Sequence, residues 1–178
     1  MPILMTAEIF QAFLKCETKA YLKYPSASGV QSEGSDWQRR LIEDFQQKCA
    51  INLRSQFPED ELVGASLPQI TENGKHRLMI DCLVQSREIQ SSIHALERLT
   101  SHGRSKHNPY IPIRFIPSKK VTKHDKLLLA FDALALSMAT GKMPPFGKII
   151  HGSEQKNLRV QLAELSNHYA LSVHRFRR

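Results

Sequence analysis

One long apolar segment constrains the fold of this chain more than any other feature. Residues 126–140, KLLLAFDALALSMAT, are apolar on most sides of a helix. Thr122 and Asp125 form a capping box in front of the segment, and Gly141 with the prolines after it marks the end. A helix that is apolar on most sides has to be buried, because it has no wide polar face for water. We therefore predict a buried helix inside a larger fold.

Short runs rich in β-forming residues lie on both sides of this helix. Residues 78–85 and 89–99 are separated by a polar turn, which predicts a hairpin. Residues 110–117, YIPIRFIP, favour a strand, but the prolines within and before it cannot donate ladder hydrogen bonds, so we expect this strand at an edge, bulged or short. Residues 146–152, FGKIIHG, predict a short interior strand. Strands that alternate with helices indicate an α/β fold.

Two amphipathic helices are predicted ahead of the strands. Apolar residues recur at helical spacing over residues 6–24 and again over residues 35–57, where Ser35 starts a capping box. Near the other end of the chain, residues 157–162 predict a strand or the start of a helix, and residues 163–178 predict a basic helix. The predicted order is two helices, three strands, the buried helix, a strand and a terminal helix.

Length and composition fit one ordinary domain. The 178 residues are 41% apolar and 24% charged, which is enough to bury a core without disulfides. We expect a single domain over residues 1–178, with two helices in 6–57, the sheet and buried helix in 76–152, and a basic C-terminal segment in 153–178. The three cysteines include no CxxC pair, so we expect neither a disulfide framework nor a zinc site. Without a leader or a long apolar run, we expect a soluble cytoplasmic protein with no membrane partner.

Positive charge is concentrated in two segments. The net charge is +8, and residues 98–126 carry +7 while residues 148–178 carry +4, which leaves −3 for the rest. Two basic segments on an otherwise mildly acidic chain indicate a polyanionic partner such as nucleic acid, and a lysine-rich solvated surface is the alternative. We expect phosphate contacts from Arg98, Arg104, Lys106, Arg114, Lys119, Lys120 and Lys123.

Two parts of the sequence resemble a known family. The opening TAEIFQAFLKCETKAYL and the segment KLLLAFDALALSMATGKMPPFGKIIHG resemble the RecB-like nucleases of the PD-(D/E)XK family, which are related to the CRISPR-associated RecB-like exonucleases. The core order of that family is a helix, three strands, a helix and a fourth strand. The resemblance implies a restriction-endonuclease-like core (αβββαβ, a mixed sheet flanked by helices) with an extra N-terminal helix and a C-terminal helix.

The catalytic residues of that family are not present at the matching positions. The family holds Mg²⁺ with an acid on one strand and an acid-x-Lys on the next, which together position the attacking water. Here His94 stands at the position of the first acid, and Ile113-Arg114-Phe115 stands where the family has E-x-K. The resemblance then implies a catalytically degenerate, nucleic-acid-binding protein that acts within a larger complex, on DNA rather than RNA.

A displaced catalytic set is the alternative, and it would make the chain a metal-dependent deoxyribonuclease. Its members would be Glu43, Asp81, Glu97 and Lys119, with Asp81 and Glu97 as ligands of Mg²⁺ or Mn²⁺. Each residue also has a simpler interpretation. Asp81 would face solvent, Glu97 would be an ion-pair partner, Glu43 would be a solvated acid, and the lysine would contact phosphate.

Two further hypotheses concern cofactors and partners. The clustered form of the family binds iron and sulfur through one early cysteine and three near the C-terminus. Cys16 matches the early position, but no C-terminal trio follows, so we expect no iron–sulfur cluster. A third hypothesis for the function is an interaction subunit whose basic face binds an acidic protein, because arginine and aromatic residues favour both kinds of interface.

Overall fold

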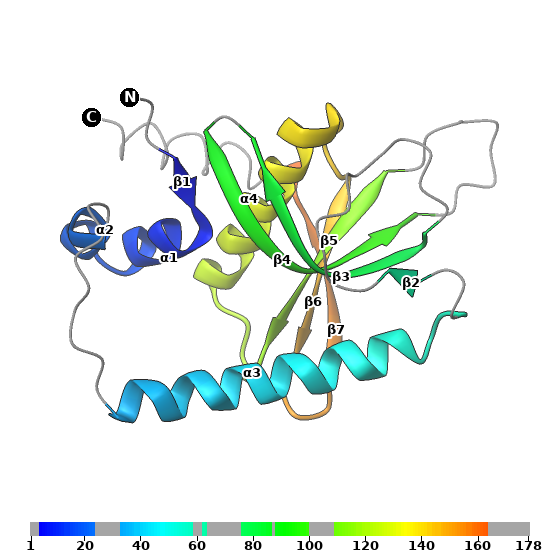
Figure 1. The fold of residues 1–178 in the computed structure, drawn as a ribbon, viewed down its shortest axis with the longest axis horizontal. Coiled ribbons are helices and arrows are strands. Elements are labelled where there is room, and N and C mark those ends of the chain that lie inside the picture. Colours follow the sequence, from blue (N-terminus) through cyan, green and yellow to red (C-terminus); the bar gives the residue numbers. More distant parts are fainter. Residues whose placement is uncertain are drawn as a thin grey trace.

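A β-sheet with helices on both faces forms the centre of the computed structural model (Figure 1). The structure describes residues 4–23, 33–58, 62–63, 76–86, 88–99 and 109–163. The strands are β1 (Met5–Thr6), β2 (Leu62–Val63), β3 (Leu78–Gln85), β4 (Ile89–Arg98), β5 (Tyr110–Ile116), β6 (Phe146–His151) and β7 (Lys156–Gln161). The helices are α1 (Ala7–Lys15), α2 (Glu17–Lys23), α3 (Glu33–Arg54) and α4 (Lys123–Thr140).

The sheet is mixed. Six strands follow one another in the order β2, β3, β4, β5, β6 and β7, and β1 pairs with β4 off this path. Within the central strands, β3–β4 and β4–β5 are antiparallel, whereas β5 and β6 are parallel and are joined through α4. The prediction of an α/β fold with a mixed sheet flanked by helices is therefore confirmed.

Apolar side chains cover both faces of this sheet. On one face, α1 and α4 pack against β3 and β4, and the Phe10 ring of α1 stacks on the Phe131 ring of α4 with centroids 4.9 Å apart. On the opposite face, Cys49 and Leu53 of α3 belong to one cluster with Ile113 of β5. A third cluster joins α4 to β6 and β7. The predicted burial of α4 is confirmed, because it contacts the sheet and α1 at once.

The start and the end of α4 follow the sequence signals. The hydroxyl of Thr122 accepts a hydrogen bond from the Asp125 N–H, and the carboxylate of Asp125 accepts one from the Thr122 N–H. Gly141 ends the helix with φ 74°, a left-handed conformation that glycine adopts without a steric penalty. Among the described helices, including α4, none combines the length and hydropathy needed to cross a bilayer.

The prediction of one helix over residues 6–24 is wrong. The backbone of Cys16 is extended, with φ −166°, and it separates α1 from α2. Hydrogen bonding from the Lys19 backbone lowers the pKa of the Cys16 thiol, as expected for a side chain at the start of the second helix. The predicted start of the next helix is also displaced, since α3 begins at Glu33 and Ser35 lies inside it.

Three more predictions concern the hairpin and the C-terminal part of the chain. The hairpin of β3 and β4 is confirmed as an antiparallel pair. β7 confirms the strand alternative for residues 157–162, and it pairs with β6. The basic helix expected over residues 163–178 falls, from residue 164 onward, outside the described part of the chain.

The prediction of an edge position for β5 is wrong, because β5 lies between β4 and β6. Leu99 N–H donates to the Pro109 carbonyl at 3.0 Å, so these two residues form a hydrogen-bonded pair. Along an antiparallel ladder, hydrogen-bonded and non-hydrogen-bonded pairs alternate. By that alternation, Leu96 and Pro112 form a non-hydrogen-bonded pair, so the Pro112 nitrogen faces away from β4. Pairing with β6 begins one residue later, at Ile113. The proline therefore interrupts neither ladder.

We expect Phe10→Ala to destabilise the whole domain, because Phe10 is buried between α1 and α4. The free energy of unfolding should fall by about 3–5 kcal/mol, the usual cost of truncating a buried phenylalanine. Urea denaturation followed by circular dichroism measures this value. Trp37→Ala is the matched control, since its side chain is 64% exposed and its removal should change stability by less than about 0.5 kcal/mol. Equal effects of the two variants would contradict this view of the core.

Candidate functional site

The strands β4 and β5 separate part-way along their length. Residues 95–98 of β4 pair with β5, but residues 89–90 of β4 pair with β1. The second half of β5 pairs with β6. Residues 91–94 of β4 and 114–116 of β5 therefore border a split in the sheet, and Figure 1 shows β3 and β4 turning together away from β5.

The split starts where β3 and β4 both depart from regular strand geometry, at two residues that face each other. Asp81 and His94 lie opposite each other, and pairing between β3 and β4 continues in the same register on both sides of them. Asp81 has φ 54°, in the left-handed region. Ile80 and Cys82 are two positions apart and would share a face in a regular strand, yet Ile80 packs in the cluster of α3 and Cys82 in that of α1 and α4. The side chains of β4 reverse face in the same way around His94.

At the split, the imidazole of His94 accepts a backbone hydrogen bond that a carbonyl of a neighbouring strand would accept in a regular sheet. The Phe115 N–H of β5 donates to His94 Nδ1 at 2.8 Å. Nε2 lies 3.1 Å from the side-chain amide of Gln46 on α3. Burial, with a smaller contribution from the Arg114 charge, lowers the pKa of His94 to about 3. The ring is thus neutral near pH 7. Because Nδ1 accepts from Phe115, the proton is on Nε2, which donates to Gln46 when the amide oxygen of Gln46 faces the ring.

A buried carboxylate holds the other face of the split. Asp132 of α4 is 0% exposed and accepts two hydrogen bonds of 2.8 Å from the Arg114 guanidinium of β5. The hydroxyl of Ser91 on β4 donates to the same carboxylate at 2.5 Å. Asp132 therefore joins α4 to both strands where they no longer pair with each other. The side chain of Arg114 is 12% exposed, and its charge is directed at Asp132.

Glu97 is engaged in a second ion pair. Its carboxylate accepts a hydrogen bond from Lys148 Nζ of β6, and both side chains are half-buried. The two strands that carry them lie on either side of β5. This contact agrees with the simpler interpretation of Glu97 as an ion-pair partner; the partner is Lys148 of β6 and not the neighbouring Arg98.

The residues of the predicted catalytic set lie on different elements of the fold. Asp81 is exposed on β3, Glu43 is exposed on α3, and Lys119 is exposed in the loop after β5. Glu97 is paired as described above. Within the described ranges, no group of three or more His, Cys, Asp or Glu side chains is placed to hold a metal ion.

The predicted phosphate contacts divide among three locations. Lys119, Lys120 and Lys123 are exposed between the end of β5 and the first turn of α4. Arg98 pairs with Tyr110 at the opposite end of β5. Arg114 is bound to Asp132, and Arg104 and Lys106 lie outside the described residues. One edge of the sheet therefore collects three of the seven basic side chains.

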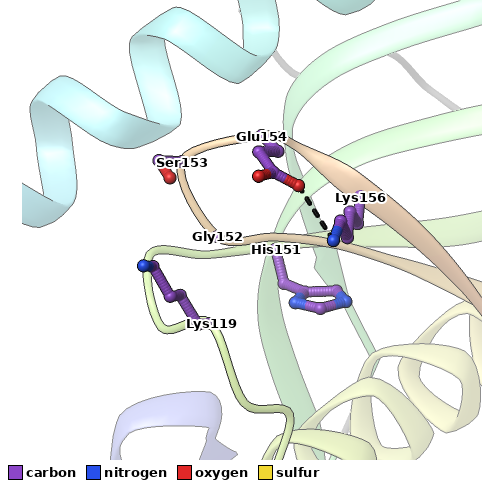
Figure 2. A pocket seen from close by; sticks show the side chains of 6 residues that line it. All are labelled: Lys119, His151, Gly152, Ser153, Glu154 and Lys156. Atoms are coloured by element: carbon purple, nitrogen blue, oxygen red, sulfur yellow. Dashed lines mark ion pairs between the residues drawn. The ribbon is translucent and has the colours of Figure 1, made fainter.

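A small pocket lies at this same edge, where the parallel strands β5 and β6 end. Figure 2 shows its lining, which consists of Lys119, His151, Gly152, Ser153, Glu154 and Lys156. Its volume is about 120 Å³. Lys156 Nζ lies 2.8 Å from the Glu154 carboxylate, and Lys119 lines the pocket from the loop after β5.

Two features of this site were not predicted. Asp132 is the one acid in an otherwise apolar helical segment, and a lone acid in a buried helix signals a buried partner. From that signal one could predict that Asp132 is paired, but not that its partner is Arg114. The position of Lys156 at the same pocket as Lys119 had no sequence signal, because β7 is placed beside β6 only by the sheet.

No protein-family model and no curated protein matches this sequence. The chemistry of the site therefore has to be inferred from its own residues. In the split, the charged and polar side chains bind one another, which stabilises the fold. At the edge near α4, the exposed Lys119 and Lys156 line a pocket together with Glu154, and further exposed lysines lie nearby, which suits the binding of an anion.

The buried pair of Asp132 and Arg114 provides a stability prediction. Asp132→Leu should lower the free energy of unfolding by about 3–5 kcal/mol, because it leaves the Arg114 charge buried without a partner. The double variant Asp132→Leu/Arg114→Met should be less destabilised than Asp132→Leu alone, since it removes both charges. Chemical denaturation of the parent, the two single variants and the double variant measures the coupling. A double variant as unstable as the sum of the single variants would show that the two charges are not coupled.

His94 provides a pH prediction. The unfolded chain binds a proton at this histidine below its ordinary pKa of about 6.5, whereas the folded ring stays neutral down to about pH 3. The unfolded state therefore binds more protons in this window, so the free energy of unfolding falls as the pH falls from about 6.5 toward 3. The slope from this residue is at most about 1.4 kcal/mol per pH unit.

His94→Gln isolates that contribution, because glutamine keeps an acceptor for the Phe115 N–H but does not titrate. The free energy of unfolding of parent and variant is measured by urea denaturation between pH 7 and pH 4. The variant should lose less stability across this range. Parallel curves for the two proteins would assign the pH dependence to other groups.

Proposed function

We propose that this chain is a nuclease-fold protein that binds nucleic acid, without a catalytic set of its own, as a component of a larger complex. The observation that carries the proposal is the exposed basic edge formed by Lys119, Lys120, Lys123 and Lys156 at the ends of β5 and β6. Exposed lysines on one edge are the usual source of sequence-independent phosphate contacts.

The order of the elements supports the nuclease-fold part of the proposal. α3, β3, β4, β5, α4 and β6 follow one another as a helix, three strands, a helix and a fourth strand. This is the αβββαβ order that the resemblance to the RecB-like nucleases implies. The sheet they form is mixed and has helices on both faces.

The residues at the positions matched to the catalytic residues of the family support the absence of a catalytic set. Ile113 and Phe115, at the positions matched to the acid and the lysine of E-x-K, are buried against α3. His94, at the position matched to the first acid, is neutral and bound to the Phe115 N–H. Neither apolar side chains nor a neutral ring of low pKa attracts Mg²⁺, which requires oxygen ligands.

Part of α3 supports participation in a complex. Trp37, Leu41 and Ile51 are 64%, 46% and 60% exposed. Large apolar side chains exposed on one helix are typical of surfaces that contact another protein. DNA remains our choice over RNA on the strength of the family resemblance alone.

Binding to nucleic acid should be strong at low salt and should weaken steeply as salt is added. For a fluorescent single-stranded DNA, the triple variant Lys119→Ala/Lys120→Ala/Lys123→Ala should lose most of its affinity. The slope of log affinity against log salt should become shallower by about 2, because each of the three lost phosphate contacts contributes about 0.7 to the slope on a single strand. Fluorescence anisotropy over a salt series measures both quantities.

Lys142→Ala is the matched control, because Lys142 is exposed beyond the other end of α4. It should leave the affinity and the slope nearly unchanged. Incubation of the same DNA with Mg²⁺ or Mn²⁺ should leave it intact. An absence of binding at low salt would overturn the nucleic-acid part of the proposal, and metal-dependent cleavage that survives purification would overturn the catalytic part.

A further inference from the structure

The pocket at the ends of β5 and β6 is built from a rigid frame. The Gly152 N–H donates to the Ile116 carbonyl at 3.1 Å, and the Gln155 N–H donates to the Gly152 carbonyl at 2.9 Å, which closes the turn between β6 and β7. Asn52 of α3 donates to the Gln155 side chain at 2.6 Å. The turn is thus fixed both to β5 and to α3.

Glycine is required at the base of this pocket. Gly152 has φ 71°, a left-handed conformation that glycine adopts without strain. A Cβ at this position would make only an ordinary contact, 3.5 Å from the Lys119 main chain, so the requirement for glycine comes from the backbone conformation. The loop after β5 lies against the turn after β6. The ends of neighbouring parallel strands are a common place for ligand sites in α/β proteins.

The polar groups of the pocket suit an anion. Lys119, from the loop after β5, and Lys156, at the start of β7, both line the pocket (Figure 2). The Nδ1 atom of His151 is buried and has no hydrogen-bond partner among the described residues. A buried ring nitrogen without a partner carries a free-energy cost that a bound polar group or water would remove.

Glu154 partly neutralises the pocket, but its hold on Lys156 is weak. The side chains of Lys156 and Glu154 are 68% and 71% exposed, and exposed ion pairs of this kind contribute little. A ligand with more charge than one carboxylate can therefore displace Glu154 from Lys156. A singly charged ligand would gain little by replacing the Glu154 carboxylate at Lys156, because both carry one negative charge.

We propose that this pocket binds the terminal phosphate monoester of a nucleic-acid strand, an inference that rests on the proposed function. A monoester carries close to two negative charges at neutral pH, because its second pKa is about 6, whereas a diester inside the strand carries one. Two lysines match two charges. The volume of about 120 Å³ admits a phosphate group and is well below the ~300 Å³ of sites that enclose larger ligands.

The test compares three single strands of one sequence, with a 5′-phosphate, with a 3′-phosphate or with hydroxyl groups at both ends. Fluorescence anisotropy at one fixed salt concentration measures their affinities for the full chain. A terminal phosphate at one of the two ends should improve binding about tenfold, the weight of one charge-assisted contact. Equal affinity for all three strands would overturn the inference and leave the proposed function standing.

Three variants assign the preference to the pocket. Lys156→Met should abolish the preference for a terminal phosphate, and Glu154→Gln should increase it by removing the competing carboxylate. Lys120→Met, outside the pocket lining, should weaken all strands alike and leave the preference unchanged. A preference that survives Lys156→Met would overturn the assignment.

A second experiment without nucleic acid tests this inference independently of the proposed function. Inorganic phosphate is titrated into the full chain, and the chemical shift of the Gly152 amide is followed by NMR. A saturable shift that is lost in Lys156→Met supports the pocket as a phosphate site even if no strand binds. No saturable shift in the parent protein would overturn it.

Discussion

The carboxylate of Asp132 is the contact on which the split in the sheet depends. β4 and β5 stop pairing where β4 turns toward β1, and such a separation leaves backbone groups without ladder partners. Asp132 binds Arg114 of β5 and Ser91 of β4 from α4, so one buried charge connects all three elements. His94 completes the arrangement from the other side, where its ring accepts the Phe115 N–H. The separation of the strands is thus stabilised by side chains in place of a ladder.

This arrangement explains why the split is a structural centre and the edge near α4 is the better candidate for binding. Asp132 and Glu97, two acids that border the central strands, are each bound to a basic side chain. Their charges are satisfied within the protein and are not directed at a metal or a substrate. Lys119, Lys120 and Lys123, in contrast, are exposed beyond the end of β5. Charges that are paired inside the fold are not available to a ligand, whereas exposed lysines attract anions such as phosphate.

Much of the fold could be predicted from local signals. The capping box of Thr122 and Asp125, the left-handed Gly141 and the apolar helix between them lie where the sequence places them. The local signals failed at two places. Cys16 breaks a regular helical pattern into two helices, and Pro112 is accommodated in a central strand because its nitrogen faces a place where β6 has not begun to pair. For the site, the sequence located the basic side chains but not their partners.

The sequence by itself determined most of the elements, the burial of α4 and the position of positive charge along the chain. These properties depend on residues a few positions apart, through capping, helical spacing and the turn preferences of glycine. Only the tertiary structure decided which charges are free. Arg114 and Lys119 are five positions apart in one basic segment, yet Arg114 is bound to a buried carboxylate and Lys119 lines an exposed pocket. The reason is that solvation and ion pairing depend on neighbours in space, which packing of the sheet against α4 provides.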